Sequence, residues 1–255
     1  MYVNNGCLLR QPFYNINMKN QNINHSLRRK IGKAISNWNM ISENDNILVG
    51  LSGGKDSFLL LHALNELSRR SPVKFNIAAV TIALTGMEIT PLKNYCSQNN
   101  ISIEIINHPI LEIIKLRDER SPCSFCANMR RGIISAYAKE HNFNKLALGH
   151  TIDDAIETFL MNIFFTGRAK SFKPVAHMSR TNVTVIRPLV LTTEDAIINE
   201  VKRLDLPIIS TTCPYAGHTQ RQSIRDLIAN LKNSVPDIHG KILHSLENLS
   251  ELDKW

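Results

Sequence analysis

Short apolar runs alternate with amphipathic segments from residue 46 to residue 204. The apolar runs are rich in β-branched residues, as buried strands are, and they cover 46–51, 76–84, 101–106, 145–149 and 183–188. Helices are expected between and after these runs, at 55–69, 91–99, 126–141, 153–165 and 193–204. We therefore predict an α/β fold with a doubly wound parallel sheet of about five strands. Such sheets bind ligands beyond the carboxyl ends of their strands, which is where chemistry should lie.

Helices are also expected at both ends of this core. Residues 26–39 carry apolar residues at helical spacing behind a serine that can cap the helix. Residues 207–210 are expected to be short and extended, and terminal helices are expected at 219–233 and 238–252. The first 25 residues are rich in Asn and are expected to be partly disordered. The chain is therefore predicted to consist of a basic N-terminal arm and helix (1–42), a main domain (43–235) and a C-terminal helix (236–255).

Composition excludes several classes of protein. The chain has 255 residues, of which 43% are hydrophobic and 20% charged, and this excludes collagen-like, low-complexity and disulfide-rich secreted chains. It lacks a run of about 18 apolar residues, so no transmembrane helix is expected. The N-terminus lacks the continuous apolar region of a secretory signal, and an odd cysteine count of 5 argues against a disulfide framework. We expect a cytoplasmic protein with no membrane partner.

Positive charge is concentrated at the N-terminus. The net charge is +8, and residues 1–42 contain no Asp or Glu. The cations of this arm are Arg10, Lys19, Arg28, Arg29, Lys30 and Lys33. A basic arm of this kind suits a polyanion such as RNA, because phosphate contacts release counterions. A solvated basic helix face is an equally good interpretation of the charge alone.

A glycine-rich loop, Leu51-Ser-Gly-Gly-Lys-Asp-Ser57, follows the first predicted strand and precedes a helix. Its backbone N–H groups and the helix N-terminus can bind an anion, and Ser52 and Ser57 add hydroxyl donors. Lys55 adds a cation, and Asp56 could help to hold Mg²⁺. The loop is neither a Walker A motif nor a dinucleotide-binding loop. The strand, the loop chemistry and the helix together favour a phosphate site over an ordinary turn.

Three cysteines are candidates for chemistry. Cys123 and Cys126 form a CxxC motif at a predicted helix start, where the helix dipole favours thiolates. Cys213 follows a short strand-like segment, so both loops can meet above the phosphate loop. Three thiolates suit an iron–sulfur cluster with one iron free of protein ligands, whereas addition of His218 would suit a structural zinc. Spacing alone does not choose between these two sites, and unligated thiols are a third possibility.

A basic loop and a group of phenylalanines follow the helix predicted at 153–165. Arg168, Lys170 and Lys173 could contact RNA or could simply be solvated. The phenylalanines at 159, 164 and 165 are interpreted as core residues rather than as a platform for stacking bases.

These motifs together resemble a known family. The loop sequence SGGKDS (52–57) is the motif of the ATP-pyrophosphatase (PP-loop) superfamily, whose members adenylate an oxygen atom and release pyrophosphate. Two segments, PCSFCANMRRG (122–132) and NKLALGHTIDDAIETFLMNIFFTG (144–167), look like those of the TtcA family of tRNA 2-thiocytidine synthetases. A VIRPLV segment (185–190) and the later Cys213 match in order and spacing. The resemblance implies a fold like that of the adenine nucleotide alpha hydrolases.

The resemblance also implies residue roles. ATP, Mg²⁺ and a [4Fe-4S] cluster would be the cofactors, with Cys123, Cys126 and Cys213 as the cluster ligands. Residues that would bind ATP are Ser52, Gly53, Gly54, Lys55, Asp56, Ser57, Gly149, His150 and Asp153. Catalytic roles would fall to Lys55, Asp56 and Asp154. Two departures from the family pattern are Thr151 in place of a second histidine and Ala216 in place of a further cysteine.

The function that this resemblance implies is ATP-dependent tRNA thiolation by a sulfurtransferase. The enzyme would adenylate O2 of a pyrimidine, a cytidine in the anticodon loop, and replace that oxygen with sulfur. Its partners would be tRNA, a cysteine desulfurase or other sulfur donor, and a second copy in a homodimer. Three alternatives are an adenylating ligase, a thiouridine synthetase and an RNA-binding protein with a structural zinc.

Overall fold

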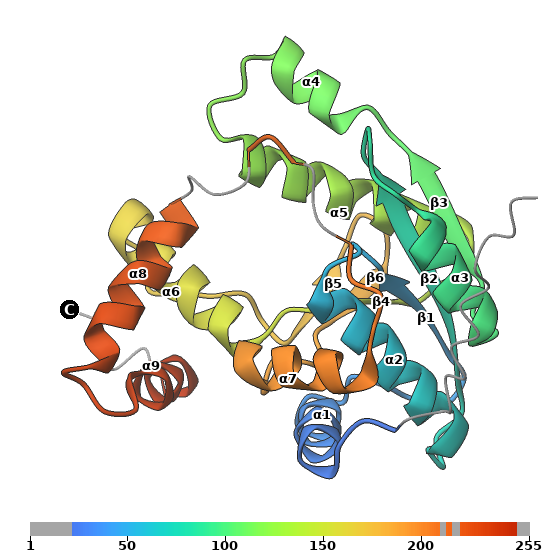
Figure 1. The fold of residues 1–255 in the computed structure, drawn as a ribbon, viewed down its shortest axis with the longest axis horizontal. Helices are drawn as coiled ribbons and strands as arrows, with labels where there is room; N and C mark the ends of the chain where they lie inside the picture. The colour runs from blue at the N-terminus through green and yellow to red at the C-terminus, as the bar shows by residue number, and fades with distance from the viewer. Residues whose placement is uncertain (1–21, 210–212, 216–219, 249–255) are drawn as a thin grey trace, which may run out of the picture.

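The computed structural model describes residues 22–209, 213–215 and 220–248. A single sheet has the strand order β3-β2-β1-β4-β6-β5 (Figure 1). Its strands are β1 (Asp45–Gly50), β2 (Phe75–Ala83), β3 (Ile103–Asn107), β4 (Lys145–Ala147), β5 (Val175–Met178) and β6 (Val183–Ile186). The predicted α/β fold and its parallel strands are confirmed. The sixth strand, β5, was not predicted; it pairs antiparallel to β6 at the sheet edge.

Helices cover both faces of this sheet (Figure 1). They are α1 (His25–Asn37), α2 (Lys55–Arg70), α3 (Thr90–Gln98), α4 (Ile110–Leu116), α5 (Pro122–Glu140), α6 (Ile152–Thr166), α7 (Glu194–Leu204), α8 (Gln220–Lys232) and α9 (Ile238–Glu247). Side chains of β1 alternate between the two faces, as strand geometry requires. Ile47 and Val49 pack with α1, α2 and α7, whereas Leu48 packs with α4 and α5. The sheet is therefore doubly wound.

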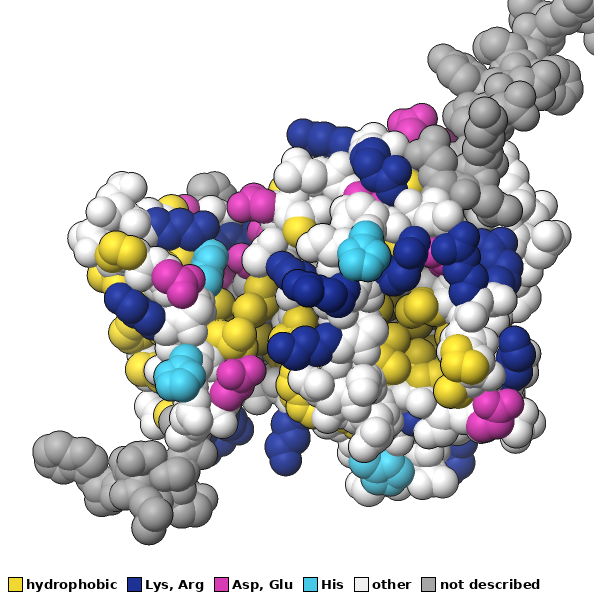
Figure 2. Space-filling model, turned by 90° about the horizontal axis from the view of Figure 1, so that it is seen from below, with side chains coloured by type: hydrophobic (Ala, Val, Ile, Leu, Met, Phe, Trp, Pro, Cys, Tyr) yellow, Lys and Arg dark blue, Asp and Glu magenta, His cyan; other side chains and the backbone are white. Residues whose placement is uncertain are grey.

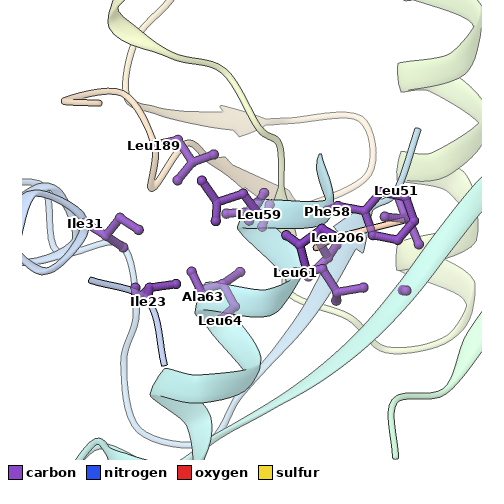
Figure 3. Packing of buried hydrophobic residues seen from close by; sticks show 14 of the residues in the cluster. Ile23, Ile31, Leu51, Phe58, Leu59, Leu61, Ala63, Leu64, Leu189 and Leu206 are labelled. Atoms are coloured by element: carbon purple, nitrogen blue, oxygen red, sulfur yellow. The ribbon is translucent and has the colours of Figure 1, made fainter. Parts of the chain in front are cut away.

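The larger core lies between the sheet and α2 (Figure 3). Phe58, Leu59 and Leu61 of α2 are fully buried, because the helix is apolar on nearly every side in its middle turns. Helix α1 packs on the same core through Ile31, and Ile23 just before it is also buried. The N-terminal helix is therefore part of the main core within the described residues.

A second group of helices lies beside the sheet rather than on it. Helix α6 extends away from the sheet, and α8 and α9 pack against α6 (Figure 1). Ile156 of α6, Ile224 and Ile228 of α8, and Ile238 of α9 form their own small core. This arrangement places the start of α6 near the sheet and its end at the outer edge of the molecule.

Some elements differ from the sequence-based prediction. Helix α4 was not predicted, and α5 begins at Pro122 rather than at 126, so the CxxC motif lies in its first turns. The described residues 207–209 form no strand, although Ile209 N–H donates to the Gly53 carbonyl at 2.9 Å. Helix α9 ends at Glu247, and residues 249–252 lie outside the described residues. None of the helices in the described residues combines the length and the apolar character that a membrane span requires.

Candidate nucleotide and thiolation site

The glycine-rich loop after β1 is closed by hydrogen bonds to the first turn of α2. Ser52 N–H donates to Ser57 Oγ at 3.1 Å, and Ser57 Oγ–H donates to the Gly54 carbonyl at 2.9 Å. Gly53 has φ +86°, a left-handed conformation that favours glycine. No side chain caps α2 at Gly54, so the first N–H groups of this helix are left for an anion.

Gly149 lets the end of β4 approach this loop closely. A Cβ atom at Gly149 would lie 3.0 Å from the backbone carbonyl of Asp56 and 3.2 Å from Ser57 N. Glycine is therefore required where these two distant segments meet, and the second predicted motif is placed directly against the phosphate loop.

A cavity of about 290 Å³ opens at the carboxyl ends of β1, β2 and β4. Sequence-predicted residues that line it are Ser52, Asp56, Ser57, Gly149 and His150. Its apolar wall includes Leu51, Val80, Ile82, Ile134, Leu146 and Leu148. Three basic side chains also line it: Arg130 and Arg131 of α5, and Arg187 just after β6. The cavity thus joins an apolar slot to an anion-binding end, as a nucleotide or nucleoside requires.

Asp56 has an unused oxygen in this cavity. Its Oδ1 atom is buried and has no hydrogen-bond partner within the described residues, while Oδ2 lies 3.2 Å from Lys55 Nζ. Burial raises the pKa of Asp56, and the charge of Lys55 opposes that shift. A buried carboxylate oxygen without a partner suits a hard cation such as Mg²⁺.

Lys55 is held by acidic side chains in this structure. Its Nζ atom lies 2.7 Å from Glu194 Oε1 at the start of α7 and 3.2 Å from Asp56 Oδ2. Burial alone would lower the pKa of Lys55, but the hydrogen bond to Glu194 and the two carboxylate charges raise it above its usual value. Lys55 is therefore protonated. Sequence reasoning missed Glu194, whose position in the first turn of α7 gives it the ordinary role of a dipole partner.

His150 forms a pair with Arg187 at the cavity wall. Arg187 Nε–H donates to His150 Nδ1 at 3.0 Å, so Nδ1 is an acceptor and the proton of the neutral ring is on Nε2. Burial, followed by the charge of Arg187, lowers the pKa of His150 to about 4. Phe172 lies against both side chains, 4.8 Å from the guanidinium and 4.9 Å from the imidazole. The pair presents a neutral donor and a cation together.

The two aspartates at the start of α6 have protein partners. Asp154 Oδ2 accepts from Thr151 N–H at 2.9 Å in a capping box, and Oδ1 lies 3.2 Å from Arg221. Asp153 Oδ2 accepts from Glu194 N–H at 2.7 Å. Neither residue lines the cavity. Their contacts hold α6, α7 and α8 together near the phosphate loop.

A buried carboxylate that sequence reasoning missed joins α6 to α8. Glu157 is only 3% exposed. It accepts from Arg221 at 2.7 Å and from Arg225 at 2.6 Å. Arg225 also lies 3.9 Å from Glu194, the partner of Lys55. The available signal was Glu157 inside an apolar helix pattern, with two arginines four residues apart on a later helix.

The three candidate cysteines come from two segments that lie together. Cys123 Sγ lies 3.9 Å from the carbonyl oxygen of Tyr215, two residues after Cys213. Burial raises the pKa of Cys126, Arg130 opposes the shift, and Cys213 and Cys123 increase it through their charges. The three thiols therefore share one neighbourhood. No group of three His, Cys, Asp or Glu within the described ranges is placed to hold a single metal ion, and His218 lies outside those ranges.

Three thiols in one neighbourhood are a donor set that an iron–sulfur cluster or a single zinc ion can use. Cys96 is buried in the main core, where burial raises its pKa to about 11, and Cys7 lies outside the described residues.

Basic residues of α1 differ in their contacts. Arg28 is tied to the buried Glu66 at 2.8 Å and to the Ile23 carbonyl, so it has a structural role. Arg29 and Lys33 are exposed, and Lys30 is half-buried. Lys and Arg outnumber acidic side chains on the face seen from below Figure 1, the side on which α1 lies (Figure 2).

Comparison with known proteins gives consistent matches. The family model described as a PP-loop domain matches residues 23–231. A tRNA-cytidine(32) 2-sulfurtransferase of Pelobacter propionicus is 38% identical over 229 residues, which cover 88% of this chain and 85% of the relative. The protein of that name from Geobacter metallireducens is 36% identical and covers 88% of this chain and 89% of the relative.

A solved structure shares the fold. The U34-tRNA thiolase NcsA from Methanococcus maripaludis, determined with its [4Fe-4S] cluster, superposes with a TM-score of 0.71. It is 25% identical in sequence, and the match covers 88% of this chain and 79% of NcsA.

Proposed function

Because the chain belongs to the PP-loop family of tRNA-cytidine(32) 2-sulfurtransferases, we propose that it thiolates tRNA at the expense of ATP. ATP adenylates O2 of a cytidine in the anticodon loop and pyrophosphate leaves. Sulfur then bonds to C2 of the base, and the adenylated oxygen leaves as part of AMP. The observation that supports this most directly is the approach of the Cys123, Cys126 and Cys213 segments to one another in a fold that also carries the phosphate loop.

The phosphate loop binds the triphosphate of ATP. Backbone N–H groups of Gly53 and Gly54 and the hydroxyls of Ser52 and Ser57 donate to its oxygens. The orphaned Asp56 Oδ1 would be a ligand for Mg²⁺, which would supply positive charge beside the triphosphate. The positive charge of Lys55 favours the departure of pyrophosphate in the same way, once Lys55 leaves Glu194 and binds a phosphate oxygen instead.

The cavity wall orients the base to be modified. The apolar slot excludes water from the base, and the neutral His150 ring donates from Nε2 toward a carbonyl oxygen in the cavity. Arg130, Arg131 and Arg187 hold phosphates of the nucleotide substrates. Asp153, Asp154 and Gly149 support the site by fixing the end of β4 and the start of α6 against the phosphate loop.

Cys123, Cys126 and Cys213 would hold a [4Fe-4S] cluster, and that cluster would supply an iron without a protein ligand for the sulfur chemistry. Burial raises the pKa of Cys126, and the positive charge of Arg130 opposes this rise.

Three further features complete the proposal. The sulfur comes from a cysteine desulfurase or another donor, the enzyme works in the cytoplasm, and it forms a homodimer. They stay predictions, as does the division into an arm at 1–42, a thiolase domain at 43–235 and a C-terminal helix at 236–255.

Mass spectrometry of tRNA nucleosides tests the function directly. Cells that lack this protein should lose 2-thiocytidine, and the wild-type gene should restore it. Loss of a thiouridine instead would show that the enzyme modifies uridine rather than cytidine. Unchanged thionucleosides would overturn the proposal.

Two measurements in vitro separate the chemical steps. Wild-type protein should release pyrophosphate and AMP in the presence of tRNA, whereas release of ADP and phosphate would refute adenylation. Cys213→Ala should lose most iron and all thiolation, while Cys96→Ala, at a buried cysteine of the main core, should keep its iron. Full activity of Cys213→Ala would refute the three-ligand model.

A further inference from the structure

Two neighbouring phenylalanines are exposed at the end of α6. The exposed fraction is 56% for Phe164 and 49% for Phe165, whereas Phe159 on the same helix is buried. The expectation that all three belong to the core is therefore wrong for Phe164 and Phe165, because these two lie in the last turn of α6, beyond the residues that pack with α8 and α9. Exposed aromatic pairs are uncommon and indicate a binding surface.

The loop after these phenylalanines is held in a defined shape. Gly167 ends α6 in a left-handed conformation, and Arg168 N–H donates to the Asn162 carbonyl at 3.1 Å. The Asn162 side chain in turn donates to the Lys170 carbonyl at 2.8 Å. Ser171 Oγ–H donates to the Ala155 carbonyl at 2.7 Å. The phenylalanines are therefore presented on a preformed support.

This region is basic as well as aromatic. Residues 158–193 contain no Asp or Glu, and their cations are Arg168, Lys170, Lys173, Arg180 and Arg187. Arg168, Lys170 and Lys173 are exposed, and none of them forms an ion pair within the described residues. Unpaired cations beside exposed aromatic rings match nucleic acid, which offers phosphates and base faces together.

The same loop runs back to the cavity. Phe172 lies against His150 and Arg187, and Arg187 Nη1–H donates to the Lys173 carbonyl at 2.7 Å. Helix α6 starts beside the cavity and is 15 residues long, so its far end lies about 22 Å away. An RNA with one base in the cavity can therefore follow this loop outward along the protein surface.

We propose that Phe164, Phe165, Arg168 and Lys170 form a platform on which an unpaired base of the RNA substrate stacks. The phenylalanine rings contact the base face, and the two cations bind the flanking phosphates. The inference rests on the proposed function, since it requires a single-stranded region next to the modified nucleotide. It assigns the surface to RNA rather than to a second copy of the chain, because a self-contact would bring the unpaired cations of both copies together.

Binding of an unmodified tRNA transcript to the full-length protein, followed by fluorescence anisotropy, tests the platform. Stacking of one base predicts a roughly 5- to 150-fold loss of affinity for Phe164→Ala together with Phe165→Ala. The double variant Phe164→Trp with Phe165→Trp should keep the tRNA affinity of the wild type, because its aromatic rings can still stack. The double variant Phe164→Leu with Phe165→Leu should lose affinity as the alanine variant does. Leu116→Ala is the matched control, because Leu116 is 88% exposed on α4 and should leave affinity unchanged.

Charge and assembly measurements complete the test. Arg168→Gln with Lys170→Gln should flatten the dependence of log Kd on log salt by about 1.5 units. ATP affinity should stay at the wild-type value in every platform variant, because none of the changed residues lines the cavity. Wild-type affinity in the double alanine variant would overturn the platform while leaving tRNA thiolation standing. Loss of a wild-type dimer in that variant, with tRNA affinity unchanged, would assign the surface to a second copy. Failure of the wild-type protein to bind tRNA would instead overturn the proposed function.

Discussion

The His150 side chain should make the stability of the protein depend on pH below neutrality. Burial, and then the adjacent Arg187 charge, lower its pKa from 6.5 to about 4. In the unfolded chain the imidazole keeps its ordinary pKa. Above pH 6.5 the ring is neutral in both states and makes no pH-dependent contribution. As the pH falls from 6.5 toward 4, only the unfolded chain takes up this proton, so the folded state loses stability.

The size of this loss follows from the shift. Each unit of difference between the unfolded and folded pKa corresponds to about 1.36 kcal/mol. The free energy of unfolding is therefore lower by about 3 kcal/mol below pH 4. At pH 4.5 about 2.5 kcal/mol of it should already be present. The Asp154 carboxylate raises the pKa of His150, whereas the charges of Arg221 and Arg131 lower it further. The charge of Arg187 has the largest effect of these neighbours.

His150→Asn isolates the contribution of His150 titration to stability. The Oδ1 atom of the new asparagine can accept from Arg187 Nε–H, and the asparagine side chain does not titrate. Urea unfolding of both proteins at pH 7.5 and pH 4.5 gives the difference in unfolding free energy at each pH. Other titrating groups are common to both proteins and cancel. The difference should shift in favour of the variant by about 2.5 kcal/mol at the lower pH. A difference that stays constant within about 0.5 kcal/mol would refute a neutral buried His150.

Three other changes test other parts of the structure. Glu157→Gln should destabilise the protein by about 2 kcal/mol in urea unfolding, since two arginines that still reach solvent lose a buried carboxylate. Gly149→Ala should weaken ATP binding measured by equilibrium dialysis, because the new Cβ atom would lie 3.0 Å from the backbone of the phosphate loop. Gly132→Ala is the control and should bind ATP normally, because a Cβ atom there would have no neighbour within 4 Å. Neutralising Arg29, Lys30 and Lys33 together should reduce the salt slope of tRNA binding by about 2 units, and an unchanged slope would show that these charges are only solvated.

The alternation of apolar runs and amphipathic segments was sufficient to predict the parallel sheet. It worked because β1, β2 and β4 are buried on both sides and therefore read as continuous apolar runs. The pattern failed for β5, which is only four residues long and half exposed at the sheet edge. It also failed for α4, whose seven residues are too few to show a helical period. The early start of α5 was missed because the CxxC segment has no amphipathic pattern.

Site residues on contiguous motifs could be found from sequence, whereas those that depend on tertiary pairing could not. The phosphate loop and Gly149 are fixed by backbone geometry, and this leaves a local signature. Glu157 and Glu194 act through partners on other helices, more than 60 residues away for Arg221 and Glu157. The exposure of Phe164 depends on where α8 and α9 stop covering α6, which no local pattern encodes.

Charge pairs connect the phosphate loop to the C-terminal helices. Lys55 contacts Glu194 of α7, Glu194 lies near Arg225 of α8, and Arg225 shares the buried Glu157 of α6 with Arg221. Each carboxylate in this series has more than one cationic neighbour, so the position of one cation affects the next. Helices α8 and α9 lie beside the sheet, yet they hold the helix that begins at the cavity and ends at the exposed phenylalanines. The same helix therefore sets the distance between the base to be modified and the surface proposed to bind the surrounding RNA.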